Sequence, residues 1–287
     1  KTIKNSLMSL NGQFADAFTP AQVAQKVKTL GVSKAETPFL PLIVLSLMAG
    51  AFISFGAMYY TVVMTNPSEA YGAAKMLGGF AFSLGFILVV IAGAELFTGN
   101  NLIVMAWARK RVTTLQIARN WILVYLANGI GALITVYLVF ASGFLDNGHH
   151  EVGVTALKIG LAKASLAPTE AFVRGIFCNA LVCLASWMVY ASRSVTDKVL
   201  AVIFPISAFV AMGFEHCIAN MFMIPLAMVA SLDPEIVALS GLSAEALEPL
   251  SMSGLLHNII PVTVGNILGG TVMVGMAYYM VYLYDRD

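Results

Sequence analysis

In the stretch Gly213-Phe214-Glu215-His216-Cys217-Ile218-Ala219-Asn220-Met221-Phe222-Met223, an adjacent Glu and His and then an Asn interrupt a long apolar run. Apolar residues make up 59% of the 287 positions, and charged residues make up only 11%. Soluble domains carry about 25% charged residues, so this run is expected to cross a bilayer. An ionisable residue inside a membrane span is by default a candidate functional residue. The sequence therefore predicts an all-α, multi-pass membrane protein.

The motif has an earlier echo in Gly93-Ala94-Glu95-Leu96-Phe97-Thr98-Gly99-Asn100. Both stretches read G-x-E-x-x-x-x-N, and His216 stands where Leu96 stands. Irregular backbone inside a membrane is tolerated only where protein or a water-filled cavity satisfies it. We therefore expect two broken helices that meet at one permeation site.

The apolar runs predict six transmembrane helices, of which the second and the fifth are broken. A polar segment, 1–37, precedes them, and its short helix from Thr19-Pro20 to Leu30 is either an interfacial helix or a lid over a pore mouth. Loops are expected at 145–167 and at the acidic stretch 231–253. The six spans together form one channel domain at 38–284. They are expected at about 38–64, 72–108 (broken near 98–101), 115–144, 168–190, 198–230 (broken near 216–220) and 255–282.

Charge distribution predicts the orientation of the chain. Six spans place both termini on one side, and twelve of the 16 Lys and Arg residues fall in segments assigned to that side. By the positive-inside rule, both termini lie in the cytoplasm. A formal net charge of +1 argues against a nucleic-acid partner. The run His149-His150-Glu151 could bind a metal, but it is more typical of a solvated turn, so we expect neither a metal site nor a cofactor.

The two halves of the chain match in three places, one in each span. Gly50–Ser54 parallels Gly175–Asn179, the two glutamate motifs correspond, and Asn128-x-x-Gly131 parallels Asn266-x-x-Gly269. Each half has three spans, an odd number, so the second half must be inverted in the membrane. Inverted repeats with interrupted helices in corresponding positions point to a midplane permeation site. The repeats are expected at about 38–144 and 168–284.

The residues of the breaks suggest separate roles. Glu95 and Glu215 are expected to cap the orphan N–H groups of the half-helix that follows each break, beside Asn100 and Asn220. His216 has no titratable counterpart in the first motif, where Leu96 occupies the matching position. A neutral imidazole donates one hydrogen bond, and a protonated imidazole donates two and carries charge, which suits a small monovalent anion or a proton. The alternative is a core histidine bonded to a backbone carbonyl.

Other side chains near the breaks could line a pore or belong to the core. Thr98 could supply a second hydrogen-bond donor from the opposite break. The apolar side chains could form constrictions or simply pack in the core; they are Phe82, Phe86, Leu96, Phe97 and Phe209.

Three longer motifs carry a resemblance to a known family: 213–225, Ala94-Glu95-Leu96-Phe97-Thr98 with Asn120-Trp121, and Ile260-Pro261-Val262-Thr263-Val264-Gly265-Asn266. Over about 32–284 the chain resembles the formate/nitrite transporter family, and within it the bacterial formate channels. The resemblance implies an aquaporin-like six-helix protomer in the bacterial inner membrane. It also implies a homopentamer with one pore in each protomer.

The resemblance also implies residue roles. His216 falls on the central histidine, Thr98 on the loop threonine and Lys163 on an anion-attracting lysine of an outer vestibule. The helix at about 20–32 resembles a segment that closes the cytoplasmic mouth at acidic pH. Glu95 stands where the family has Asp, and Phe86 stands where the formate channels are expected to have Leu. The implied constrictions are Phe82, Leu96, Phe97, Val182 and Phe209, and the implied polar pore-lining residues are Asn179 and Asn266.

We therefore expect a bidirectional, pH-gated channel for formate and not an enzyme. Nitrite and hydrosulfide stay open as permeants, as does the choice between passive and proton-coupled transport. A pore for neutral solutes such as water or glycerol is the alternative on the same architecture. A membrane hydrolase that uses Glu215 and His216 is disfavoured, because adjacent helical residues point about 100° apart.

Overall fold

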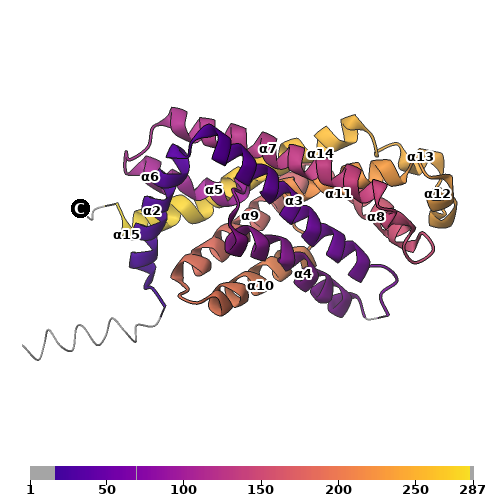
Figure 1. Ribbon diagram of the computed structural model, residues 1–287, viewed down its shortest axis with the longest axis horizontal. Helices are drawn as coiled ribbons and strands as arrows, with labels where there is room; N and C mark the ends of the chain where they lie inside the picture. The colour runs from indigo at the N-terminus through magenta and orange to yellow at the C-terminus, as the bar shows by residue number, and fades with distance from the viewer. Residues whose placement is uncertain (1–16, 69, 285–287) are drawn as a thin grey trace, which may run out of the picture.

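The computed structural model describes residues 17–68 and 70–284, so the first sixteen residues of the expected polar segment 1–37 lie outside it. Within these residues every regular element is a helix (Figure 1). The helices are α2 (Pro20–Glu36), α3 (Phe39–Val63), α4 (Tyr71–Leu88), η1 (Val89–Gly93), α5 (Phe97–Asn100), η2 (Asn101–Ile103), α6 (Val104–Ala108), α7 (Thr114–Ala141), η3 (Phe144–Asp146), α8 (Glu151–Ala164), α9 (Pro168–Ala191), α10 (Val195–Ala211), α11 (Cys217–Ala230), α12 (Pro234–Ser240), α13 (Ala244–Leu247), α14 (Met252–Leu268), η4 (Gly269–Met276) and α15 (Ala277–Tyr282).

Five of the described helices are long and apolar enough to cross a membrane, and a sixth is counted if α11 and α12, which meet at 100°, form one bent span. The five are Phe39–Val63, Tyr71–Gly93, Thr114–Ala141, Pro168–Ala191 and Met252–Tyr282. The expected fifth span is divided between α10 and α11. The all-helical fold and the positions of the other five predicted spans therefore agree with the sequence.

Glycines allow helices to cross closely at two points of the bundle. A Cβ on Gly50 of α3 would lie 2.1 Å from the carbonyl oxygen of Asn128 on α7. A Cβ on Gly269, just after α14, would lie 2.1 Å from the carbonyl oxygen of Ile176 on α9. No side chain fits at either point, so the backbones touch directly. This is the close approach that drives helix association in lipid, where apolar burial gives little.

The helix α2 covers the end of the bundle where the described chain begins and ends, next to α15 (Figure 1). It starts with a capping box, in which Thr19 accepts from the Gln22 backbone and Gln22 accepts from the Thr19 backbone. Its apolar face, with Val23 and Val27, packs on α6 and α9. The sequence predicted this helix, but it runs to Glu36, six residues beyond the expected end.

The opposite end of the bundle holds short helices where the sequence predicted loops (Figure 1). The residues expected to form a loop after the third span contain the 14-residue helix α8, and the acidic stretch contains α12 and α13. Buried Val152, Ala156, Leu157 and Ala164 place one face of α8 in the core. The loop prediction was wrong because two glycines and two lysines in α8 hid this helical periodicity.

In each G-x-E motif the backbone leaves the helical conformation near the glycine and becomes helical again after the glutamate. The first helix ends at Gly93, where φ is +86°, and α5 starts at Phe97. The second ends at Ala211, Gly213 has a φ of +72°, and α11 starts at Cys217. Both breaks begin earlier than predicted, so Thr98, Asn100 and Asn220 lie in the helices that follow.

Candidate functional site

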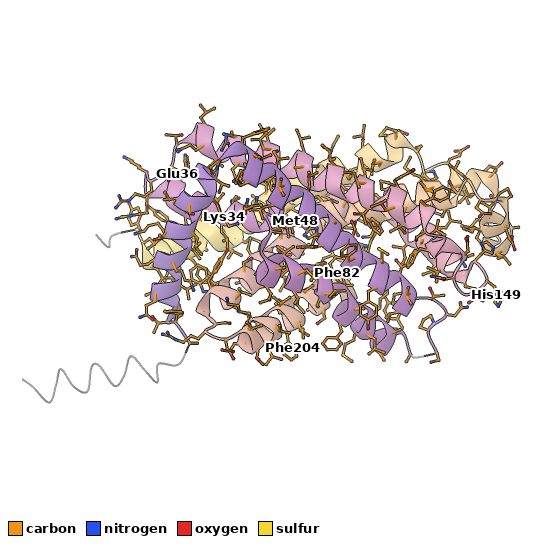
Figure 2. The ribbon with its side chains drawn as sticks, viewed as in Figure 1. Lys34, Glu36, Met48, Phe82, His149 and Phe204 are labelled. Atoms are coloured by element: carbon orange, nitrogen blue, oxygen red, sulfur yellow. The ribbon has the colours of Figure 1, made fainter. Side chains whose placement is uncertain are left out.

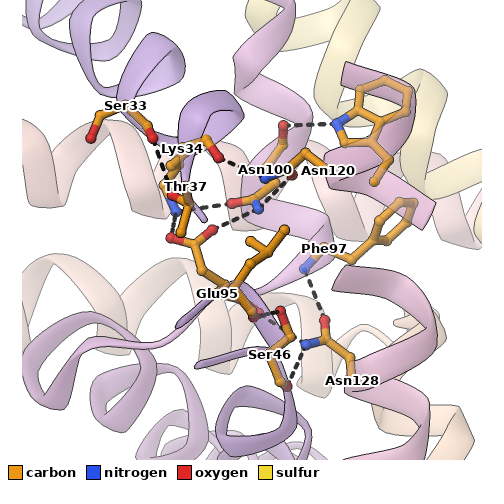
Figure 3. A network of polar contacts seen from close by, with 11 residues as sticks. Ser33, Lys34, Thr37, Ser46, Glu95, Phe97, Asn100, Asn120 and Asn128 are labelled. Atoms are coloured by element: carbon orange, nitrogen blue, oxygen red, sulfur yellow. Dashed lines mark hydrogen bonds and ion pairs between the residues drawn. The ribbon is translucent and has the colours of Figure 1, made fainter. Parts of the chain in front are cut away.

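The first break is stabilised by a cluster of side chains from four elements (Figure 3). The Nζ of Lys34 on α2 lies 2.7 Å from Oε1 of Glu95 and 3.0 Å from Oδ1 of Asn100. The Nδ2 of Asn100 donates to Oε2 of Glu95 at 2.7 Å and to Oδ1 of Asn120 at 2.9 Å. Both carboxylate oxygens of Glu95 are therefore bonded, which is what a buried charge requires.

A second cluster repeats this arrangement at the other break. The Nζ of Lys163 on α8 lies 2.9 Å from Oε1 of Glu215. The Nδ2 of Asn220 donates to Oε2 of Glu215 at 2.6 Å and to Oδ1 of Asn258 at 2.7 Å. Lys34 and Asn258 were missed by the sequence reasoning, because each reaches the cluster from an element remote in the chain.

Two asparagines, not the glutamates, satisfy the first N–H of each following helix. The Phe97 N–H donates to Oδ1 of Asn128 at 2.9 Å, and the Cys217 N–H donates to Oδ1 of Asn266 at 3.0 Å. The prediction that Glu95 and Glu215 cap these helices was wrong. Their carboxylates pair with lysines, a partner that the local sequence does not contain.

The same two asparagines show which residues of the two halves occupy matching positions. The Nδ2 of Asn128 donates to the Ser46 carbonyl, and that of Asn266 donates to the Gly175 carbonyl. Ser46 therefore corresponds to Gly175, and the predicted match of Gly50 with Gly175 is off by one helical turn. Small residues recur once per turn on a packed helix face, so pattern matching alone could not choose among the turns.

His216 and Thr98 come together from the two breaks. The His216 Nδ1 accepts from the Ala219 backbone N–H at 3.2 Å, so this nitrogen carries no proton. The neutral ring then carries its proton on Nε2, which donates to Thr98 Oγ1 at 3.1 Å. A proton on Nδ1 would break the bond that caps α11. The pair is buried, with His216 only 3% exposed and Thr98 fully covered.

This arrangement leaves the Thr98 hydroxyl proton free. Among the described residues, the His216 bond is the one hydrogen bond of Thr98 Oγ1, and the oxygen serves there as acceptor. A hydroxyl accepts and donates at the same time, so its proton can be given to a further acceptor. The pair is therefore a buried hydrogen-bond donor site.

A cavity of about 770 Å³, called the vestibule below, reaches His216 from the end opposite α2. Four cationic side chains line it against two carboxylates; they are Lys75, Lys158, Lys163 and Arg174, with Glu151 and Glu215. A cavity lined mainly by one sign of charge concentrates ions of the opposite sign. Phe82, which Figure 2 places in the middle of the molecule, and Phe209 also line the vestibule.

Two aromatic rings stand next to His216 in the wall of the vestibule. The ring of Phe82 meets that of Phe209 edge to face, with centroids 5.8 Å apart. The ring of Phe209 in turn stacks on the imidazole of His216 at 6.1 Å. The other predicted constriction residues are buried but do not line the vestibule; they are Phe86, Leu96, Phe97 and Val182.

The predicted polar lining residues Asn179 and Asn266 are fully covered and bonded to protein. The Nδ2 of Asn179 donates to the Asn266 carbonyl at 2.6 Å and to Oδ1 of Asn101 at 2.8 Å. Neither asparagine lines the vestibule. Lys163 differs, because it both lines the vestibule and pairs with Glu215.

Comparison with known proteins adds the family. The family model described as "Formate/nitrite transporter" matches residues 21–280. The formate channel FocA of Escherichia coli K12 is 41% identical over 276 residues, which cover 95% of this chain and 97% of FocA. FocA of Haemophilus influenzae is 40% identical, with 91% and 93% covered. A solved pentameric formate channel with formate bound has a TM-score of 0.79 at 41% identity, covering 84% of this chain and 96% of that one. A second structure, an FNT family ion channel, has a TM-score of 0.77 at 26% identity, with 91% and 98% covered.

Proposed function

Because this chain belongs to the formate/nitrite transporter family, we propose that it is a channel that carries formate through a membrane in both directions. The relatives are named as channels and transporters, so the chain is a transport protein and not an enzyme. The observation that carries the proposal is a positively lined vestibule whose wall includes His216, the buried residue that pairs with Thr98. Nitrite and other small monovalent anions are further candidate permeants.

The proposed architecture is two inverted three-span repeats with broken second and fifth spans, as in an aquaporin. The matched lysine–glutamate–asparagine clusters at the two breaks support it. Because Lys34 and Lys163 complete these clusters, each repeat includes the helix before its first span, α2 in one and α8 in the other. The repeats then begin earlier than 38 and 168, the bounds that the apolar runs suggest.

Assembly and location follow from the same family. We propose a homopentamer with one pore in each protomer, as in the pentameric formate channel that the chain resembles. Exposed apolar side chains along α3, α7 and α14, such as Leu126, Tyr137 and Ile260, suit contact with lipid or a neighbouring protomer. We place the channel in the bacterial inner membrane with both termini in the cytoplasm, so the vestibule faces outward.

The permeation step takes place at His216 and Thr98. A bare anion in a dry apolar constriction lacks any partner and is costly. Behind the Phe82 and Phe209 rings, the free hydroxyl proton of Thr98 binds the anion. The Nε2–H of His216 polarises that hydroxyl, since cooperative hydrogen-bond chains strengthen each member. Transient protonation of the anion at this point, which would couple formate to a proton, is the alternative step.

The gating helix is α2. It lies over the inner end of the bundle, where the Lys26 Nζ donates to the Tyr190 carbonyl at 3.2 Å. Partial burial, with Lys198 and Arg193 nearby, lowers the pKa of Lys26. The ion pair of Lys34 with Glu95 anchors α2 at the first break. We propose that movement of α2 about this anchor closes the cytoplasmic mouth at acidic pH.

Formate flux into proteoliposomes tests the proposed function. His216→Ala removes the Nε2–H donor and is expected to lower formate flux sharply at near-neutral pH. His257→Ala is the matched control, because His257 is exposed on α14. Equal formate flux in the two variants would overturn the role of His216. Glycerol swelling equal to formate swelling would favour the neutral-solute pore instead.

A further inference from the structure

Three side chains with metal-ligating atoms gather at the end of the molecule opposite α2. They are Asp146 at the end of η3, His150 just before α8, and Asp233 just before α12, and one ligand atom of each lies within 4.8 Å of the others. The first two are four residues apart, and the third comes from a loop more than eighty positions later. Only the packing of α12 against α8 brings them together.

The imidazole of His150 is oriented as a metal ligand usually is. Its Nδ1 lies 3.4 Å from Oδ1 of Asp146, and this nitrogen is a buried atom without a hydrogen-bond partner among the described residues. Its Nε2 lies 3.4 Å from Oε2 of Glu235. A ligating histidine almost always donates its second ring N–H to a carboxylate, a backbone carbonyl or water, which leaves the first nitrogen free to bind. Glu235 is placed to serve as that second partner.

The carboxylate of Asp233 is held in position by the helix that follows it. Its Oδ1 accepts from the backbone N–H groups of Glu235 at 2.8 Å and Ile236 at 3.4 Å. These bonds cap α12 and leave Oδ2 available. Asp146 and Asp233 also line a surface cavity of about 930 Å³, so an ion has a route to the cluster.

We propose that Asp146, His150 and Asp233 form a binding site for a divalent transition-metal ion of the Zn²⁺ class. Imidazole nitrogen and carboxylate oxygen are both zinc ligands, and three protein ligands leave a fourth position for water. Ca²⁺ requires six or more oxygen ligands, which this set does not provide. Two carboxylates and a neutral imidazole also offset the charge of the ion.

Bound metal would join the start of α8 to the start of α12. The vestibule wall includes His149 and Glu151 at the start of α8, and Leu239 near the end of α12. Figure 2 shows His149 at this outer tip of the molecule. The ion would therefore fix the wall of the vestibule without entering the path itself. This proposal departs from the sequence expectation, which considered only the consecutive run at 149–151.

Calorimetric titration of Zn²⁺ into the purified full chain tests the site. The protein is held in detergent, stripped with a chelator, and free of any polyhistidine tag. We expect one saturable site per chain in the wild type, at least about tenfold weaker binding in His150→Ala, and unchanged binding in His149→Ala. The control is matched, because His149 is the neighbouring histidine but lies outside the cluster. Absence of a saturable site, or equal binding by the two variants, would overturn the proposal.

Thermal unfolding gives a second readout that does not depend on transport. A ligand that binds only the folded state raises Tm, so Zn²⁺ should stabilise the wild type and His149→Ala but not His150→Ala. Asp233→Asn should also lose the Zn²⁺ effect, while its side-chain oxygen still caps α12. An equal rise in Tm with Ca²⁺ and Zn²⁺ would contradict a site built on imidazole nitrogen.

Discussion

Thr98→Val isolates the donor that we place in the path of the anion. Threonine and valine have nearly the same shape, so the substitution removes the hydroxyl and little else. That hydroxyl accepts the Nε2–H of His216 at 3.1 Å and holds the one free proton of the pair. Without it, an anion that has passed the Phe82 and Phe209 rings meets no donor on the Thr98 side.

The size of the effect follows from this single bond. A hydrogen bond to a charged group contributes about 1.5–3 kcal/mol, and each 1.4 kcal/mol is a factor of ten. If the bond forms at the barrier, formate flux into proteoliposomes at pH 7 should fall roughly 10- to 150-fold. The variant also leaves the Nε2–H of His216 without its acceptor. Size-exclusion chromatography must therefore show that the variant still assembles before its flux is compared.

Thr98→Ser is the matched control, since it keeps the hydroxyl and loses only a methyl group. We expect it to retain most of the wild-type flux. If Thr98→Val carries formate as fast as Thr98→Ser, the hydroxyl is not the donor, and the permeation step proposed here is refuted.

Three further predictions concern the clusters, the packing and the vestibule. Lys163→Met leaves the buried carboxylate of Glu215 without its cation and should lower the free energy of unfolding in denaturant by about 3–5 kcal/mol. Adding Glu215→Gln should restore stability. An unchanged unfolding midpoint would contradict the buried pair. Gly50→Val inserts a side chain 2.1 Å from a carbonyl oxygen and should abolish a monodisperse peak in gel filtration, whereas Gly72→Val, where nothing lies within 4 Å, should behave as wild type. Lys158→Gln should slow anion flux at low ionic strength, and the difference should vanish at about 1 M salt, where the Debye length is about 3 Å; a difference that persists in high salt would show a direct contact instead of steering.

The long apolar spans were predictable because their signal is local. Lipid accepts only helices whose backbone groups are bonded within the segment, so a run of about 20 apolar residues suffices to identify one. The missed helix α8 also carried a signal, since Val152, Ala156 and Leu157 follow helical spacing. Its glycines and lysines lower its mean hydropathy, so its sequence resembles that of a loop.

The breaks were placed one turn too late for a different reason. Asn100 and Asn220 look like break residues, but each is helical and reaches back to a glutamate five positions earlier. A long-range partner, not a local preference, decides where the helix starts again. The acceptor of the first N–H of each helix was assigned to the wrong residue for the same reason, since Asn128 on α7 and Asn266 on α14 accept it.

The sequence by itself determined that this chain is an all-helical membrane protein, that two related motifs interrupt it, and that His216 distinguishes one motif from the other. Composition and spacing carry that information because bilayer solvation acts on each segment separately. Only the tertiary structure decided which side chains meet. It paired Lys34 with Glu95 and Lys163 with Glu215, set His216 against Thr98, and gathered Asp146, His150 and Asp233. Hydrogen bonds and ligand sets need atoms within a few ångströms, and helix packing alone brings such distant residues that close.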